Sequence, residues 1–116
     1  MLERLAIESN ELETHADRAA EMLRSMANKW RLLVLCNLVA GEKSVGELQR
    51  IVGISQSALS QHLATLRAKQ LVAIRRDAQT IYYRLNGPEV AAILTTLYSL
   101  YCGPNALVCG LDAGGI

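Results

Sequence analysis

The sequence has no apolar run near the roughly 20 residues that a membrane-spanning helix needs. It has no Ser/His/Asp arrangement, no paired acids in an apolar setting, no phosphate-binding glycine loop and no Cys-x-x-Cys motif. Its first residues, Met-Leu-Glu-Arg-Leu-Ala-Ile-Glu, are acidic and mixed, unlike a secretory signal. These absences predict a protein that is neither an enzyme nor a membrane protein and that carries no cofactor. We expect a cytoplasmic location, where cysteines are normally reduced.

The composition is that of one ordinary globular domain over residues 1–116, with 51% hydrophobic and 20% charged residues. The net charge of +1 hides an uneven distribution. Residues 1–25 carry three basic and six acidic groups, whereas residues 50–86 carry six basic groups and one acid. This split indicates a basic surface for a polyanion and a different role for the N-terminal part, with chance clustering as the simpler alternative.

The most informative segment is residues 55–67, which the spacing of Leu59, Leu63 and Leu66 predicts to be a helix with one buried face. The opposite face is small, polar and uncharged, where an ordinary exposed face would carry Glu and Lys. Glutamine pairs bidentately with adenine in a major groove, and serine serves several bases. The residues expected on this face are Gln56, Ser57, Ser60, Gln61 and Ala64.

The residues before this segment predict a helix-turn-helix. Ser44 and Glu47 form a capping box that starts a short helix ending at Val52, after helices expected over residues 8–26 and 29–39. Gly53 supplies the tight turn and Ser55 caps the next helix. Two helices joined by such a turn are the helix-turn-helix unit.

Two β-rich runs follow, at residues 71–76 and 80–85, and predict a hairpin with basic residues at its tip, the wing of a winged helix. Pro88 then opens a last helix. The expected fold is mainly α with a small β-hairpin wing, in the order α-α-α-α-β-β-α. The first and last helices have more apolar surface than so small a core needs, so we expect a homodimer through them; alternatively, they pack on their own core. Residues 103–116 are expected to form a flexible tail.

The order of elements, with Ser-Gln-Ser-Ala-Leu-Ser-Gln-His-Leu at 55–63 and Thr-Ile-Tyr-Tyr-Arg-Leu at 80–85, resembles the ArsR/SmtB family over roughly residues 15–102. That resemblance implies a dimeric winged-helix repressor that leaves its double-stranded operator DNA when an inducer binds. The metal-sensing members place thiolates before the recognition helix, or Asp and His pairs on the last helix. Neither set is present at residues 44–50 or 88–101, so no metal site of those kinds is expected.

The positions of Cys36 and Cys102 resemble the persulfide- and redox-responsive branch of that family. The resemblance implies that a reactive sulfur species modifies one thiol and that a disulfide or polysulfide then bridges the pair. A buried, structural Cys36 is the alternative. Cys109 is a bystander, a resolving thiol or a third ligand for arsenite or Cu(I), so a soft-metal-responsive repressor is a second possibility. A winged-helix protein-interaction module without DNA activity is a third.

The residue assignments follow from these elements. Bases are expected to be read by Gln56, Ser57, Ser60 and Gln61. Phosphates are expected to be held by Ser55, His62, Arg67, Arg75, Arg76 and Arg84, although His62 could instead pack and the wing arginines could form a solvated edge.

Overall fold

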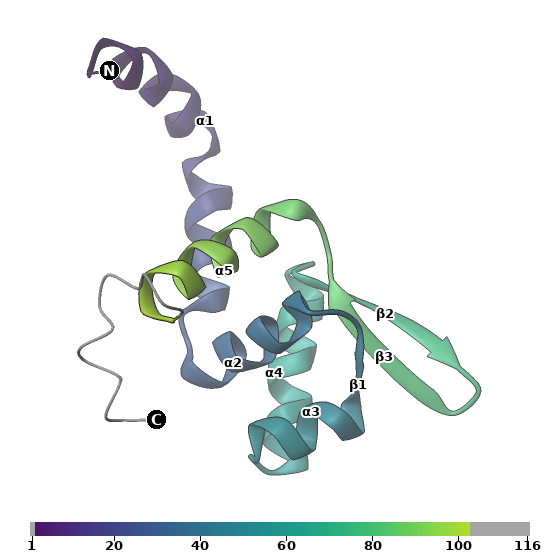
Figure 1. The fold of residues 1–116 in the computed structure, drawn as a ribbon. Helices are drawn as coiled ribbons and strands as arrows, with labels where there is room; N and C mark the ends of the chain where they lie inside the picture. Colours follow the sequence, from purple (N-terminus) through teal and green to yellow (C-terminus); the bar gives the residue numbers. More distant parts are fainter. Residues whose placement is uncertain (1, 103–116) are drawn as a thin grey trace.

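The computed structural model describes residues 2–102, with side chains from residue 11 onward (Figure 1). The element order confirms the predicted winged helix-turn-helix, with one added strand. Across the described residues, no helix is both long enough and apolar enough to cross a membrane. The expected tail at 103–116 lies outside the described residues. The elements are α1 (Leu2–Met26), α2 (Lys29–Val39), β1 (Lys43–Ser44), α3 (Val45–Val52), α4 (Gln56–Ala68), β2 (Val72–Asp77), β3 (Thr80–Leu85) and α5 (Pro88–Tyr101).

Local capping sets where the helices begin and end. The Asn28 side chain accepts hydrogen bonds from the backbone N–H groups of Trp30 and Arg31, at 2.9 and 3.1 Å, and so starts α2. The predicted capping box between Ser44 and Glu47 is present in both directions and starts α3. α1 starts at Leu2 rather than at residue 8, because most residues of the Leu-Glu-Arg-Leu-Ala-Ile stretch before position 8 are also good helix formers.

A small leucine-rich core holds the helix-turn-helix against the rest of the molecule. Leu35 of α2, Leu48 of α3 and Leu59 and Leu66 of α4 are completely buried. Full burial of such a side chain contributes roughly 1.5–3 kcal/mol each. The core therefore fixes α4 with Leu59, Leu63 and Leu66 inward, as the spacing predicted.

The sheet has three antiparallel strands in the order β1-β3-β2. β2 and β3 form the predicted wing hairpin, which closes through Ala78 and Gln79 and extends away from the helices (Figure 1). The two-residue strand β1 pairs with Tyr82 and Tyr83 of β3 and was not predicted. A strand of two residues is too short to show an alternating pattern, and its partner β3 lies far along the chain, so the sequence does not indicate β1.

The spacing of Leu32, Leu35, Cys36 and Val39 predicts that these four residues share the inward face of α2, and this prediction is wrong in part. Cys36 and Val39 are exposed, and the buried residues of α2 are Val34, Leu35 and Leu38. Most positions of this helix are apolar, so the sequence does not distinguish its faces. The alternative that Cys36 is a buried structural thiol is therefore contradicted.

Candidate nucleic-acid interface

The outer face of α4 is polar, exposed and uncharged. Gln56, Ser57, Ser60 and Gln61 are all exposed. The Ser55 hydroxyl accepts the backbone N–H of Ala58 at 3.1 Å and so caps the helix. Four hydrogen-bonding side chains thus stand on a helix whose opposite side is locked in the core. Such a surface suits direct contact with base edges.

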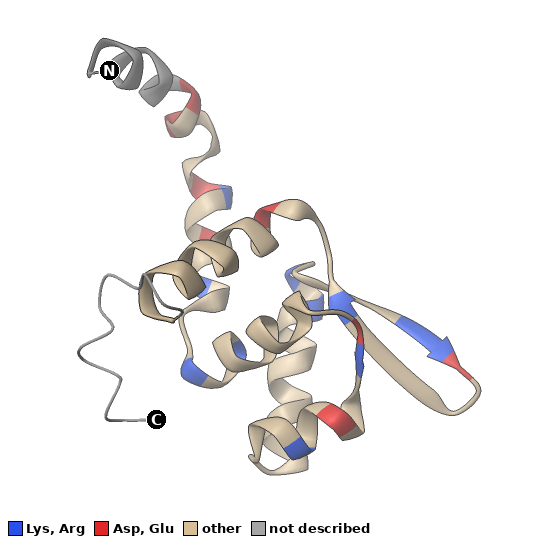
Figure 2. Cartoon of the chain, viewed as in Figure 1, with Lys and Arg blue, Asp and Glu red and all other residues tan. Residues whose placement is uncertain are grey.

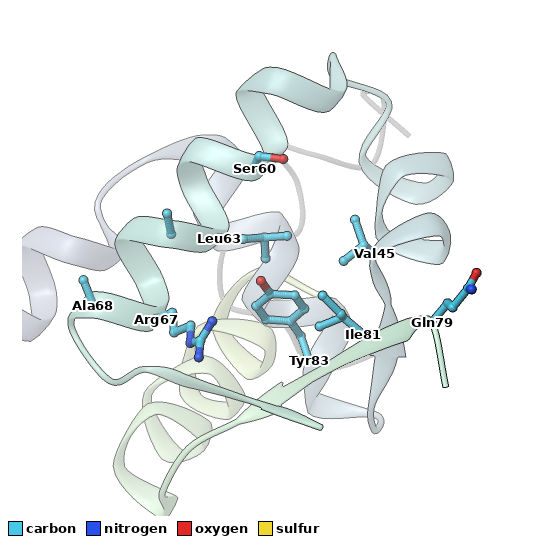
Figure 3. Close-up of a pocket in the computed structure, with 9 residues that line it drawn as sticks. Val45, Ser60, Leu63, Arg67, Ala68, Gln79, Ile81 and Tyr83 are labelled. Atoms are coloured by element: carbon cyan, nitrogen blue, oxygen red, sulfur yellow. The ribbon is translucent and has the colours of Figure 1, made fainter. Parts of the chain in front are cut away.

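A cleft of about 710 Å³ separates α4 from the wing (Figure 3). Its apolar lining includes Leu63 of α4, Ile81 and Tyr83 of β3 and Val45 of α3. Arg67 brings a guanidinium group to the cleft, near the Tyr83 ring in Figure 3. α4 and the wing are therefore two walls of one concave surface, and Ser60 is the base-reading candidate that lines it. The other lining residues are Ser60, Ala64, Ala68 and Gln79.

Sequence reasoning did not assign Tyr83 or Gln79 to the site. The alternation of β3 placed one of its two tyrosines toward the core, and Tyr83 does pack against the core. The sequence does not indicate that the same strand faces α4. Only the packing of the wing against the helix-turn-helix reveals this.

Two neighbouring wing arginines have different environments. Arg75 donates from Nε to both oxygens of the Glu42 carboxylate at 3.2 and 3.0 Å, and from Nη2 to one of them at 2.7 Å. Its guanidinium also lies 4.5 Å from the centroid of the Tyr82 ring. The hydrogen bond from Arg75 holds the pKa of Glu42 below its usual value. Within the described part of the chain, Arg76 is exposed and forms no ion pair.

His62 lies on the inner side of α4. Its ring is half-buried, and Nδ1 is 3.4 Å from Nη1 of Arg31 on α2. Burial, and then the charge of Arg31, hold the pKa of His62 below its usual value. The structure thus places His62 against α2, whereas Gln61 beside it is exposed.

The uneven charge distribution of the sequence has a spatial counterpart (Figure 2). Acidic residues lie along α1, whereas basic residues lie at the C-terminal end of α4, in the turn that follows it and in the wing. Lys69, at the end of α4, pairs with Glu21 of α1 at 2.8 Å. Arg67 and Arg84, like Arg76, are exposed and have no ion pair among the residues the structure describes. These three arginines are therefore exposed cations of α4 and the wing that an anionic ligand can reach.

The two described cysteines form a second candidate site. Cys36 lies on α2 and Cys102 is the C-cap residue of α5, which packs against α2. Both thiols are free and exposed. Cys36 as a residue is exposed but its thiol is partly desolvated by its neighbours, which raises its pKa, and the nearby charge of Cys102 raises it further. The fold therefore brings Cys36 and Cys102, which are 66 residues apart in sequence, close enough for the charge of one to act on the other.

Cys109 lies outside the described residues. Among the side chains described at residues 11–102, no group of three or more His, Cys, Asp or Glu residues is arranged to hold a metal ion. The sequence predicts neither of the two metal sites that the metal-sensing members of the family have, before the recognition helix or on the last helix.

A recognition helix, its capped turn and an adjoining wing define a winged helix-turn-helix DNA-binding protein. Residues 28–73 match the sequence pattern of the bacterial regulatory protein family arsR. The chain is 48% identical over 95 residues to the transcriptional activator HlyU of Vibrio cholerae, covering 82% of this chain and 88% of HlyU. It is 54% identical over 91 residues to the nodulation protein NolR of Rhizobium meliloti, covering 77% and 75%. The chain belongs to the arsR family, whose members bind operator DNA to regulate transcription.

Solved structures agree with the fold. Reduced HlyU from Vibrio cholerae superposes with a TM-score of 0.77 at 48% identity, covering 80% of this chain and 98% of that one. The transcriptional repressor BigR from Xylella fastidiosa superposes with a TM-score of 0.77 at 38% identity, covering 83% and 98%. The winged helix-turn-helix predicted from the sequence is thus confirmed.

Proposed function

We propose that this chain is a homodimeric repressor that reads operator DNA with α4 and releases it when Cys36 and Cys102 become bridged by sulfur. DNA binding is supported by one observation, which is that α4 has an exposed uncharged face beside a cleft and beside arginines without ion pairs in the described part of the chain. The proposal treats residues 1–116 as one domain. It also assigns repression, although the relatives include both an activator and a repressor by name. Repression needs only that the bound dimer occupy the operator.

The base-reading residues in this proposal are Gln56, Ser57, Ser60 and Gln61. Ser55, Arg67, Arg76 and Arg84 hold phosphates, and the backbone of one DNA strand enters the cleft between α4 and the wing. Arg75 reaches a phosphate only by leaving Glu42, so its part in phosphate binding is secondary.

The base-reading claim is tested by replacing Gln56 and Gln61 with alanine. A duplex selected in vitro from a random pool serves as the operator, and a scrambled duplex measures non-specific binding. Loss of each bidentate pair should cost about 1–3 kcal/mol of discrimination and leave non-specific affinity nearly intact. Gln70→Ala, just beyond α4, is the matched control. An equal loss on both duplexes would contradict base reading.

The dimer is supported by apolar side chains left uncovered on α1 and α5. Leu12 and Leu23 of α1 are 63% and 53% exposed, and Tyr98 and Tyr101 of α5 are 61% and 50% exposed. α1 also projects from the body of the protein (Figure 1). Pairing these faces about a two-fold axis covers them and places two recognition helices on successive turns of DNA.

Sedimentation tests this arrangement. The double variant Leu12→Glu/Tyr98→Glu should sediment as a monomer, and Ile51→Glu, at an equally exposed apolar position of α3, should remain dimeric. Wild-type protein that sediments as a monomer at all concentrations would exclude the dimer.

The thiol control is supported by the proximity and exposure of Cys36 and Cys102. Because the raised pKa of Cys36 leaves it less ionised at neutral pH, Cys102 is the first thiol to react in this scheme. Its thiolate attacks the outer sulfur of a low-molecular-weight persulfide and displaces the parent thiolate, which leaves a persulfide on Cys102. The Cys36 thiolate then attacks the Cys102 Sγ and expels hydrosulfide, which closes a disulfide.

A second sulfur transfer to Cys102 before closure gives a trisulfide bridge by the same steps. In each case the persulfide is the oxidant, and no other is needed. A longer bridge also relaxes the limit of about 7 Å between Cα atoms that a plain disulfide imposes. Resting free thiols suit the reducing cytoplasm.

Mass spectrometry after exposure to glutathione persulfide tests this chemistry. A bridge between Cys36 and Cys102 should form in wild-type protein and in Cys109→Ser, and fail to form in Cys36→Ser. Bridging that always involves Cys109 would contradict the assigned pair. A soft-metal sensor would instead show a thiolate absorption band with arsenite or Cu(I) and ignore persulfide. A protein-interaction module would show no salt-dependent DNA binding.

A further inference from the structure

One side chain of α2 joins three helices. Arg31 Nε donates to the carbonyl oxygen of Ser25 at 2.6 Å, in the last turn of α1. Arg31 Nη1 lies 3.4 Å from Nδ1 of His62 on α4. The Arg31 backbone N–H is held by Asn28 at the start of α2. A cation at the carbonyl end of α1 also stabilises that helix end.

We propose that Arg31 and His62 are a positioning pair that fixes α4 relative to α1 and α2, and that the pair works only while the His62 ring is uncharged. The inference rests on the proposed function of α4 as the DNA reader. It gives His62 a different role from a phosphate contact.

The hydrogen-bonding capacity of imidazole explains the dependence on charge. Nδ1 accepts a hydrogen bond from Arg31 only in the neutral ring with its proton on Nε2. A protonated ring has two N–H donors and a positive charge, and it faces a guanidinium that is always charged. Protonation therefore converts an attraction between α2 and α4 into a repulsion.

The other groups around His62 do not provide a competing charge. Among the residues with described side chains, Arg31 is the one charged group that shifts the pKa of His62, and it lowers it. The Ser25 carbonyl of α1 contacts Arg31, no described charged group of α1, α3 or α5 shifts the pKa of His62, and Arg67 is the one Lys or Arg residue of α4. The nearby Glu21–Lys69 pair between α1 and α4 stays ionised in mild acid, because Lys69 lowers the pKa of Glu21.

Acidification separates the positioning role from a phosphate-binding role. A histidine that contacts phosphate gains charge as the pH falls, so affinity for DNA rises. A histidine that positions α4 through Arg31 loses its contact as the pH falls, so operator affinity falls. The two roles therefore predict opposite changes in operator affinity as the pH falls.

Fluorescence anisotropy at constant ionic strength, with the selected operator and a scrambled duplex, tests the pair. Over a series from about pH 7.5 to about pH 5, wild-type operator affinity should fall about threefold to tenfold, the size of one hydrogen bond, and scrambled-duplex affinity should not fall. Because the pKa of His62 is lowered, the fall should come below the usual histidine pKa. His62→Gln keeps a neutral acceptor and should bind as wild type at the upper end of the series with a flat profile. His15→Gln, which changes the other histidine, should retain the wild-type profile. Arg31→Met should bind the operator weakly at both ends of the series.

Circular dichroism at each pH confirms that the compared proteins are folded. Operator affinity that rises or stays level in wild-type protein on acidification would overturn the pair, whatever the variants do. An unchanged acid loss in His62→Gln would also overturn it. Failure of wild-type protein to prefer any duplex at neutral pH would instead refute the proposed function.

Discussion

Replacing two adjacent wing arginines one at a time should give different losses of DNA binding. Arg76→Ala should lower both the affinity and its salt dependence, because Arg76 is exposed and has no ion-pair partner among the described residues. Arg75→Ala should change the salt dependence little, because the Arg75 guanidinium is bound by both oxygens of Glu42. The sequence alone treats the two residues as equivalent.

The size of the effect follows from counterion release. Each neutralised phosphate adds about −0.9 to the slope of log affinity against log salt concentration. A dimer carries two copies, so Arg76→Ala should make the slope shallower by about 1.8, and Arg75→Ala by much less. Glu42→Gln frees Arg75 and should make the slope steeper, by up to about 1.8.

Anisotropy titrations over a salt series measure these slopes. Arg24→Ala is the matched control, because Arg24 is an ion-paired arginine of α1, away from the wing. Equal slope changes in the Arg75 and Arg76 variants would show that Arg75 leaves Glu42 to bind phosphate. The reasoning from the Glu42 contact would then be wrong.

Three predictions concern the stability of the helix-turn-helix, measured by urea unfolding. Leu59→Ala should cost about 3 kcal/mol, because the side chain is completely buried, and a loss below about 1 kcal/mol would refute its place in the core. Gly53→Ala should cost about 1 kcal/mol from its φ of 77° alone, since no atom would clash with the new Cβ; an unchanged midpoint would contradict this conformation. Hydrogen bonds from Ser44 hold the pKa of Glu47 below its usual value. The capping box therefore stabilises the folded protein fully above the usual carboxyl pKa, and this stabilisation is lost as the pH falls through the lowered pKa of Glu47. Glu47→Gln should remove that step, and an identical acid profile would argue against the capping box.

The sequence predicts best the features that local chemistry determines. The capping box at Ser44, the turn at Gly53 and the inward leucines of α4 are encoded within a few residues of one another, and all are confirmed. The hairpin is also local, since its two strands adjoin in the chain.

The missed features depend on contacts between distant segments. Arg75 and Glu42 lie 33 residues apart, and Arg31 and His62 lie 31 apart, so no local pattern pairs them. The exposure of Cys36 depends on which side of a mostly apolar α2 meets the core. Composition does not determine that side, and packing against the other helices does.

Operator affinity measured before and after Cys36 and Cys102 are bridged in the same preparation tests whether the thiol pair controls DNA binding. Bridging should weaken operator binding about fivefold to 150-fold, the usual range for coupling between two sites. The original affinity should return on reduction. Protein shown by mass spectrometry to be fully bridged, yet binding the operator as tightly as the reduced form, would contradict the account.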